Sequence, residues 1–190
     1  EDGFLKTGVL ITSTVPANSS GTYRLETVLE SGYAHFNIPL TQWNVWGILP
    51  GLTNKEKTTL ETDVPKVESY VFDAINTKRK NLGRALLTKD TDLSKIALEK
   101  AKNMANNDYV GHWTPDGKDI MAFAKSLSLK HPNSMAENVA GGNVSHIVLQ
   151  EWLEESGSHL YSMQSANWSK IGIGYVVKNK KAYLVQVFGN

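Results

Sequence analysis

The chain has 190 residues, with 20 basic and 19 acidic side chains and a formal net charge of +1. This length suits one domain of ordinary size with a smaller appendage. The balanced charge argues against a basic surface for nucleic acid, and no apolar run reaches the roughly 20 residues of a transmembrane helix. We therefore expect neither nucleic acid as a partner nor a transmembrane segment.

The sequence contains no cysteine, which excludes disulfide bonds and thiolate chemistry. Its first residues, Glu1 to Lys6, lack a start methionine and the pattern of a signal peptide. We expect an exported protein, extracellular or at the cell surface, whose leader is absent from this sequence. A lipoprotein would fit the same expectation.

Residues 7–49 show the pattern of short β-strands. The predicted strands cover 7–14, 22–30, 33–40 and 42–49, and the middle two alternate apolar with polar residues. Turn-forming residues separate the first three, as an antiparallel meander requires. We predict a small N-terminal antiparallel β unit, residues 1–62, which leans on the rest of the chain because it buries little apolar surface alone.

From residue 63 the hydrophobic period becomes helical. Val67, Val71 and Ile75 share one face of a first helix, Pro65 suits its first turn, and Gly83 supplies a stop. The residue pattern therefore predicts that a second domain, residues 63–190, begins with a helix.

Three more helices and a hairpin are predicted after it. The second helix covers 91–105 with Asp92 as its N-cap, and the third covers 119–127. The fourth begins at Asn143 or Ser145, and the residues predicted on its inner face are Val144, Ile147, Val148 and Trp152. Residues 171–177 and 182–188 flank a turn and predict a β-hairpin. These elements predict a sheet covered by helices.

Several short motifs follow the second helix in a fixed order. They are H-W-T-P-D-G at 112–117, E-N-V-A at 137–140, S-G-S-H at 156–159 and a closing pair, I-G-I-G-Y and V-Q-V-F-G. The first three resemble the patterns H-T-S-P-D-G, G-E-N-I-A and S-P-G-H of bacterial proteins in the CAP superfamily. That superfamily includes cysteine-rich secretory proteins, antigen 5 and plant pathogenesis-related proteins.

The bacterial SCP-like extracellular proteins are the nearer match, and the resemblance covers about Val67 to Gly189. It implies an α+β fold in which the second domain is an α-β-α sandwich. The sequence departs from the pattern at Ala136, where glycine is usual, and at Leu160, where arginine is frequent. One extra residue also separates Trp152 from Ser156, which puts the geometry of that helix end in doubt.

Members of the superfamily often gather two histidines and two glutamates in one cleft. By position the resemblance implies His112, Glu137 and His159 as three of these residues. Glu155 is implied as the fourth, with Glu154 as its rival, because many bacterial relatives lack this glutamate. Trp113 is expected beside the same cleft, whereas His131 and His146 are interpreted as solvated side chains.

Two interpretations of this group stay open from the residues. Two neutral imidazoles, from His112 and His159, suit zinc or another divalent metal, and a carboxylate such as Glu137 or Glu155 can serve as ligand or general base. Alternatively, each histidine pairs with a glutamate merely to tie a loop to a sheet, and Glu137 braces backbone amides.

The sequence contains no nucleophile elbow, phosphate loop or dinucleotide fingerprint. We therefore favour a secreted or surface-attached binding protein over an enzyme, with a lipid or sterol, a glycan, or a host or envelope protein as partner. The alternative is a metal-dependent hydrolase or peptidase that uses His112, His159 and Glu137. A third hypothesis is a structural role at the envelope, with the N-terminal β unit as the docking part.

Overall fold

A computed structural model describes residues 3–5, 9–12, 24–29, 32–35 and 52–190, and the chain divides into two units, Glu1–Lys57 and Thr58–Asn190. The first unit contains an antiparallel sheet in the order β1-β2-β3-β4. Its strands are β1 (Gly3–Leu5), β2 (Val9–Thr12), β3 (Arg24–Leu29) and β4 (Gly32–His35). The predicted meander is confirmed for three strands, β1 was not predicted, and the strand predicted at 42–49 lies outside the described residues.

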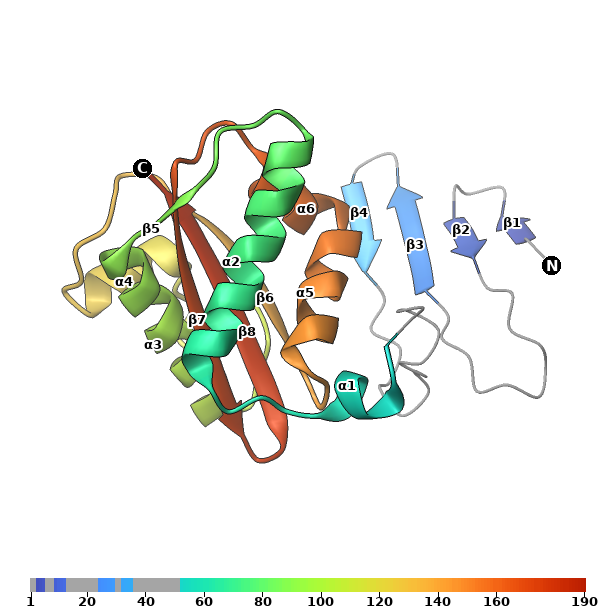
Figure 1. The fold of residues 1–190 in the computed structure, drawn as a ribbon, viewed down its shortest axis with the longest axis horizontal. Coiled ribbons are helices and arrows are strands. Elements are labelled where there is room, and N and C mark those ends of the chain that lie inside the picture. Colours follow the sequence, from blue (N-terminus) through green and yellow to red (C-terminus); the bar gives the residue numbers. More distant parts are fainter. Residues whose placement is uncertain (1–2, 6–8, 13–23, 30–31, 36–51) are drawn as a thin grey trace. The chain divides into compact units, whose positions relative to one another are not determined.

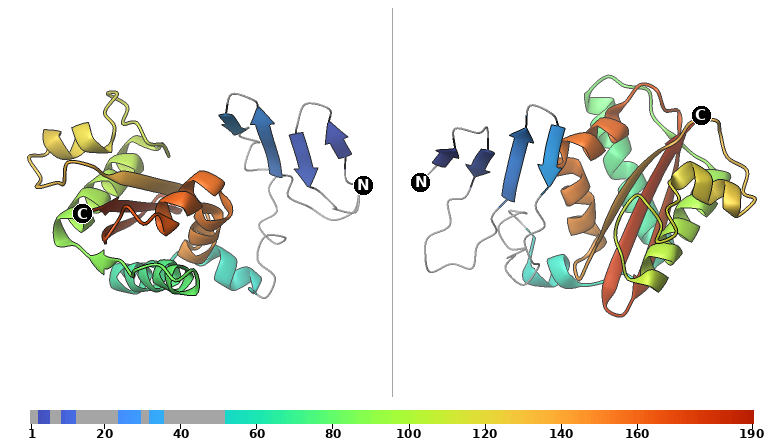
Figure 2. Two further views of the ribbon diagram at one scale, coloured as in Figure 1. Left: turned by 90° about the horizontal axis from the view of Figure 1, so that it is seen from above. Right: turned by 180° about the vertical axis from the view of Figure 1, so that it is seen from behind.

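The second unit is a sheet with helices on both faces, as predicted (Figures 1 and 2). After α1 (Asn54–Thr58), the elements are α2 (Val64–Asn81), β5 (Thr88–Lys89), α3 (Thr91–Asn107), α4 (Ile120–Ser126), β6 (Ala136–Gly142), α5 (His146–Glu155), α6 (Gly157–Gln164), β7 (Lys170–Lys178) and β8 (Lys181–Gly189). The sheet order is β5-β7-β8-β6, and β5 pairs with β7 in parallel while the other pairs are antiparallel. Strand β6 is therefore an edge strand.

The helix starts follow local capping chemistry. The Asp63 side chain accepts a hydrogen bond from the backbone N–H of Lys66 at the start of α2, and Gly83 adopts a φ of +65° after its end, as the sequence indicates. The predicted cap of α3 is wrong. Oδ1 of Asp90 caps this helix, because Asp90 is the extended residue before the first turn and Asp92 already lies within that turn.

The hairpin of β7 and β8 is confirmed. Its two turn residues, Asn179 and Lys180, have φ values of +52° and +61°. Two left-handed residues in succession are typical of the turn that matches the twist of paired strands. The tight turn fixes the register in which Lys178 pairs with Lys181.

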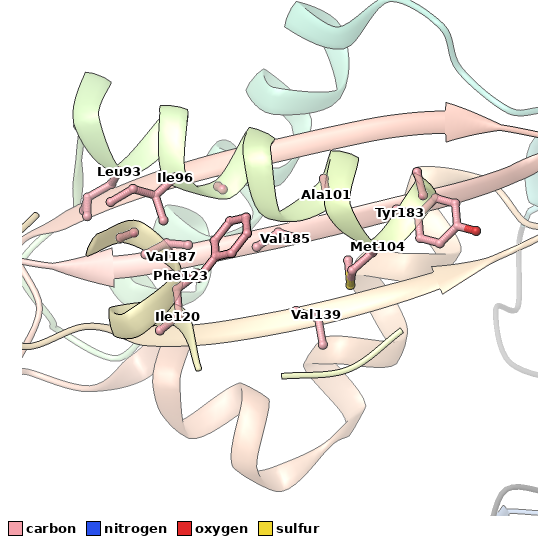
Figure 3. Close-up of a cluster of buried hydrophobic side chains, with 13 residues drawn as sticks. Leu93, Ile96, Ala101, Met104, Ile120, Phe123, Val139, Tyr183, Val185 and Val187 are labelled. Carbon is pink, nitrogen blue, oxygen red and sulfur yellow. The ribbon is translucent and has the colours of Figure 1, made fainter. Parts of the chain in front are cut away.

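Helices α3 and α4 cover one face of the sheet and form a hydrophobic core with it (Figure 3). The side chains from α3 include Leu93, Ile96 and Met104, and β8 contributes alternate residues that end at Val187. On β7, a Cβ atom added at Gly172 or Gly174 would overlap the backbone of α3. These two glycines allow the helix to lie directly on the strand.

The opposite face is covered by α2, α5 and α6. The inner side of α5 carries Leu149 and Leu153, whereas Ile147 and Trp152, predicted for this position, are only half-buried. His146 is 7% exposed, so its interpretation as a solvated side chain is wrong. The first turn of α5 packs closely enough against its neighbours to enclose this ring.

Substitution of Gly174 tests the close approach of α3 to β7. Gly174→Ala should lower the free energy of unfolding by about 1–3 kcal/mol, because the added methyl group overlaps the backbone of Ala97 and Leu98. Urea denaturation measures this loss. Gly157→Ala is the matched control, since a Cβ there meets no atom within 4 Å and alanine suits a helix. Equal stabilities of the two variants would contradict this packing.

The burial of His146 predicts a loss of stability in acid. Tyr70 of α2 and Tyr175 of β7 face its ring edge-on, with centroids 5.1 and 6.4 Å away. Burial lowers the pKa of His146; the charge of Glu61 opposes this shift and that of Lys66 reinforces it. The unfolded chain therefore binds a proton more readily, and folding stability falls as the pH drops below about 6.5.

Thermal unfolding between pH 7.5 and pH 5 measures this effect. His146→Phe should flatten the pH dependence of the melting temperature, because phenylalanine cannot take up a proton. Leu86→Ala, a change at an exposed residue whose side chain binds no proton, is the comparison and should keep the wild-type slope. An unchanged slope in His146→Phe would assign the acid sensitivity to other groups.

Candidate functional site

The loop after α3 carries His112 and is fixed at both ends. Asp108 ends the helix in the left-handed region with a φ of +49°. Farther on, the N–H of Gly117 donates to the carbonyl of Thr114 over 2.8 Å, and Gly117 has a φ of +79°. The T-P-D-G segment is therefore a closed β-turn, which holds the residues just after His112 in place.

A buried lysine on α3 also holds this loop in place. The amine of Lys100, on α3, is fully buried and donates to the backbone carbonyl of His112 over 2.9 Å and to the hydroxyl of Tyr109 over 3.3 Å. Burial lowers the pKa of Lys100, and the charge of Glu137 acts in the opposite direction. Burial also raises the pKa of Tyr109 to about 12, with further contributions from Glu137 and Asp116.

His112 and Glu137 form the central contact of the site. Nδ1 of His112 lies 2.9 Å from Oε2 of Glu137, and the side chains are 50% and 4% exposed, respectively. An ionised carboxylate can only accept, so the hydrogen in this contact belongs to Nδ1. Nε2 of a neutral His112 then keeps its lone pair, which makes it the ring atom able to accept a proton or a hydrogen bond.

The second histidine reaches the site from the other side of the edge strand. His159 lies in the first turn of α6, and its ring centroid is 6.0 Å from that of His112. The side-chain amide of Asn138 donates to the backbone carbonyl of His159 over 3.0 Å. Because successive strand residues face opposite sides, the adjacent Glu137 and Asn138 of β6 each hold one histidine.

The structure thus brings His112, Glu137 and His159 together, and Trp113, which follows His112 in the sequence, is 63% exposed. Glu155 is exposed in the last turn of α5. Its rival Glu154 is instead bonded to residues of α2 and α5. The sequence left open which of these two neighbouring glutamates faces the site. Because a helix turns by about 100° between neighbours, the two side chains point in different directions.

Sequence reasoning missed Lys100 and Asn138 as supports of the site. Lys100 occupies the apolar face of α3 together with Ala97, Ala101 and Met104, so a lone charge in that stripe was a usable signal. Asn138 follows Glu137 directly, but its partner lies 21 residues away. Only the folded chain identifies that partner.

The donors at the site fall short of a complete metal centre. Within the described part of the chain, no group of three or more histidine, cysteine, aspartate or glutamate side chains is placed to hold a metal ion. Oε2 of Glu137 is already paired with His112, and a protein zinc site takes three or four ligands. The predicted contact of zinc or another divalent ion with His112 and His159 stays a prediction.

In the part of the chain that the structure describes, every helix is too short or too polar to span a membrane.

Comparison with known families gives a match over most of the second unit. The family model described as "Cysteine-rich secretory protein family" (CAP) matches residues 72–188. An uncharacterized protein of Bacillus subtilis (strain 168), YkwD, is 29% identical in an alignment of 126 residues that covers 64% of this chain and 48% of the relative. The chain therefore spans about half the length of this curated relative.

Two solved structures share the fold. An outer surface protein from Borrelia burgdorferi has a TM-score of 0.61 at 22% identity, over 67% of this chain and 95% of that protein. An extracellular protein containing an SCP domain from Bacillus anthracis str. Ames has a TM-score of 0.59 at 16% identity, over 87% of this chain and 59% of that protein. At these identities the likeness concerns the fold alone.

The pairing of His112 with Glu137 can be tested without a ligand. Glu137→Gln keeps the shape of the side chain and removes its charge, so folding stability should fall by about 1 kcal/mol. Nitrogen NMR should also show a mixture of the two tautomers of neutral His112, with the hydrogen on Nδ1 in some molecules and on Nε2 in others. Asp73→Asn, the same loss of charge at an exposed residue of α2, should leave both readouts near the wild type. Wild-type values of both readouts in Glu137→Gln would contradict the pairing.

Proposed function

Since the chain belongs to the cysteine-rich secretory protein (CAP) family, we propose that it acts mainly by binding a ligand at the site of His112, Glu137 and His159. The observation that carries this proposal is a half-exposed imidazole held by a buried carboxylate. Such a ring is fixed before a ligand arrives, so little conformational entropy is lost when it forms a hydrogen bond. A prearranged polar group at the surface is suited to recognition.

The residues that follow each histidine indicate the chemistry of the ligand. Trp113 is 63% exposed and Tyr161, two residues after His159, is 69% exposed. Large exposed aromatic rings next to hydrogen-bonding groups suit a ligand that has a flat apolar face and polar edges. A glycan combines these features, so it is the partner that we favour over a lipid or sterol and over a protein.

The place of action is outside the cell in this proposal. Two proteins with the same fold are described as an outer surface protein and as an extracellular protein. We extend that location to this chain, either secreted or attached to the surface. The proposal concerns the second unit, because the family model matches residues 72–188.

A metal-dependent hydrolase is the second candidate. The contact that favours it joins His112 Nδ1 to Glu137, because a carboxylate that holds one ring nitrogen leaves the lone pair of Nε2 able to bind a metal ion. Metal content after purification without chelator, and turnover of a peptide pool by wild type and His112→Ala, separate this candidate from pure binding. Turnover that is lost in His112→Ala would favour hydrolysis.

Affinity measurements test the binding proposal. In titrations with soluble cell-wall glycan fragments, His112→Ala and Trp113→Ala should each weaken binding by roughly tenfold, which corresponds to about 1.4 kcal/mol. His131→Ala, outside the site, is the control and should bind like the wild type. Vesicles with and without sterol are a parallel arm. Saturable binding to vesicles alone would replace the glycan by a lipid, and failure of every class would overturn the proposal.

A further inference from the structure

A chain of hydrogen bonds runs beneath the site on the face of the sheet covered by α2, α5 and α6. Its members are buried or nearly so, apart from the lysine at one end. In order, the links are Lys78 Nζ to Glu154 Oε2 at 2.9 Å, Gln150 Nε2 to Glu154 Oε1 at 2.9 Å, Gln186 Nε2 to Gln150 Oε1 at 2.7 Å, Asn138 Nδ2 to Gln186 Oε1 at 3.0 Å, and Asn138 Nδ2 to the carbonyl of His159 at 3.0 Å.

The groups at the two ends of this series of hydrogen bonds set its direction. The ionised carboxylate of Glu154 can only accept, so Gln150 must turn its NH₂ group toward it. The oxygen of Gln150 then faces Gln186 and accepts from its NH₂ group. The oxygen of Gln186 in turn accepts from Asn138. Each amide has one orientation that satisfies both neighbours, and the carboxylate of Glu154 and the carbonyl of His159, which both only accept, fix it from the two ends.

The amide of Asn138 connects this series of hydrogen bonds to the site. Its NH₂ group donates both hydrogens, to Gln186 and to the carbonyl of His159, while its buried oxygen Oδ1 accepts no hydrogen bond from the described residues. The reverse orientation would point Oδ1 at two other oxygens. A buried oxygen without a hydrogen bond lowers stability, so the favourable contribution of Asn138 comes from the two hydrogen bonds that its NH₂ group donates.

We propose that this series of hydrogen bonds has a positioning role: the charge of Glu154 orients the three buried amides and thereby fixes His159 against β6. The links join α2, α5, β8, β6 and α6, which are separate in sequence. Glu154, Gln150, Gln186 and Asn138 are then positioning residues for the second histidine. The proposal rests on the proposed function only in treating His159 as part of the binding site.

Glu154→Gln is the decisive change, because it keeps the length of the side chain and removes its charge. A glutamine can turn its own NH₂ group toward Gln150, so the carbonyl of His159 is the one end group left to fix the orientation of the amides, and the reversed orientation of the amides becomes populated. In NMR spectra the NH₂ signals of Asn138 and Gln186 should split into two sets or broaden, and the ring signals of His159 should shift. Affinity for the glycan fragments should fall several-fold.

Lys78→Gln is the matched control. It removes the ion pair to the same carboxylate but leaves the charge of Glu154 in place, so it should lower stability without moving the signals of Asn138 or His159. A role in stability alone predicts the same spectra for both variants. Wild-type signals of Asn138 and His159 in Glu154→Gln would therefore overturn the proposal, whatever the loss of stability.

A second variant covers the case in which Glu154→Gln does not fold. Gln150→Met keeps a similar volume and breaks the chain between Glu154 and Gln186, so the same signals of Asn138 and His159 should change. Unchanged signals there would also overturn the proposal. Shifted signals with no binding of any ligand would leave the positioning role standing and count against the proposed function.

Discussion

The pairing of edge strand β6 with β8 is the constraint on which the site depends. In this register Glu137 lies opposite Val187 and Asn138 opposite Gln186. Strand geometry sends these two neighbouring side chains to opposite faces of the sheet. One reaches the loop after α3 and the other reaches α6, so a single dipeptide anchors both histidines. A slip of one residue would exchange the two faces and separate the pair.

The two faces support the site in different ways. On one side a hydrophobic core and a buried lysine hold the backbone of the His112 loop. On the other side a polar chain of amides ends at the backbone of His159. A buried polar chain is costly unless its hydrogen bonds are made, and the links described here are short. Both histidines are therefore held through their backbones, and the ring of His112 is paired with the carboxylate of Glu137.

This arrangement is the reason that we propose binding in preference to a standard hydrolase mechanism. The half-exposed ring of His112 has its orientation set by Glu137, and an exposed tryptophan follows it in the chain. Acyl transfer requires in addition a nucleophile and donors for an oxyanion, and the sequence shows no motif that supplies them. Fold likeness to other proteins does not add a reaction, because one fold carries many functions.

Local patterns in the sequence determined the helices α2, α3 and α4 and the closing hairpin, since periodicity, caps and turn residues act over a few positions. The motifs also indicated His112, Glu137 and His159. The tertiary structure alone decided that 136–142 is a strand, that His146 is buried, and that Glu154 points into the amide chain. Each of these depends on partners distant in sequence, whose contacts no local pattern contains.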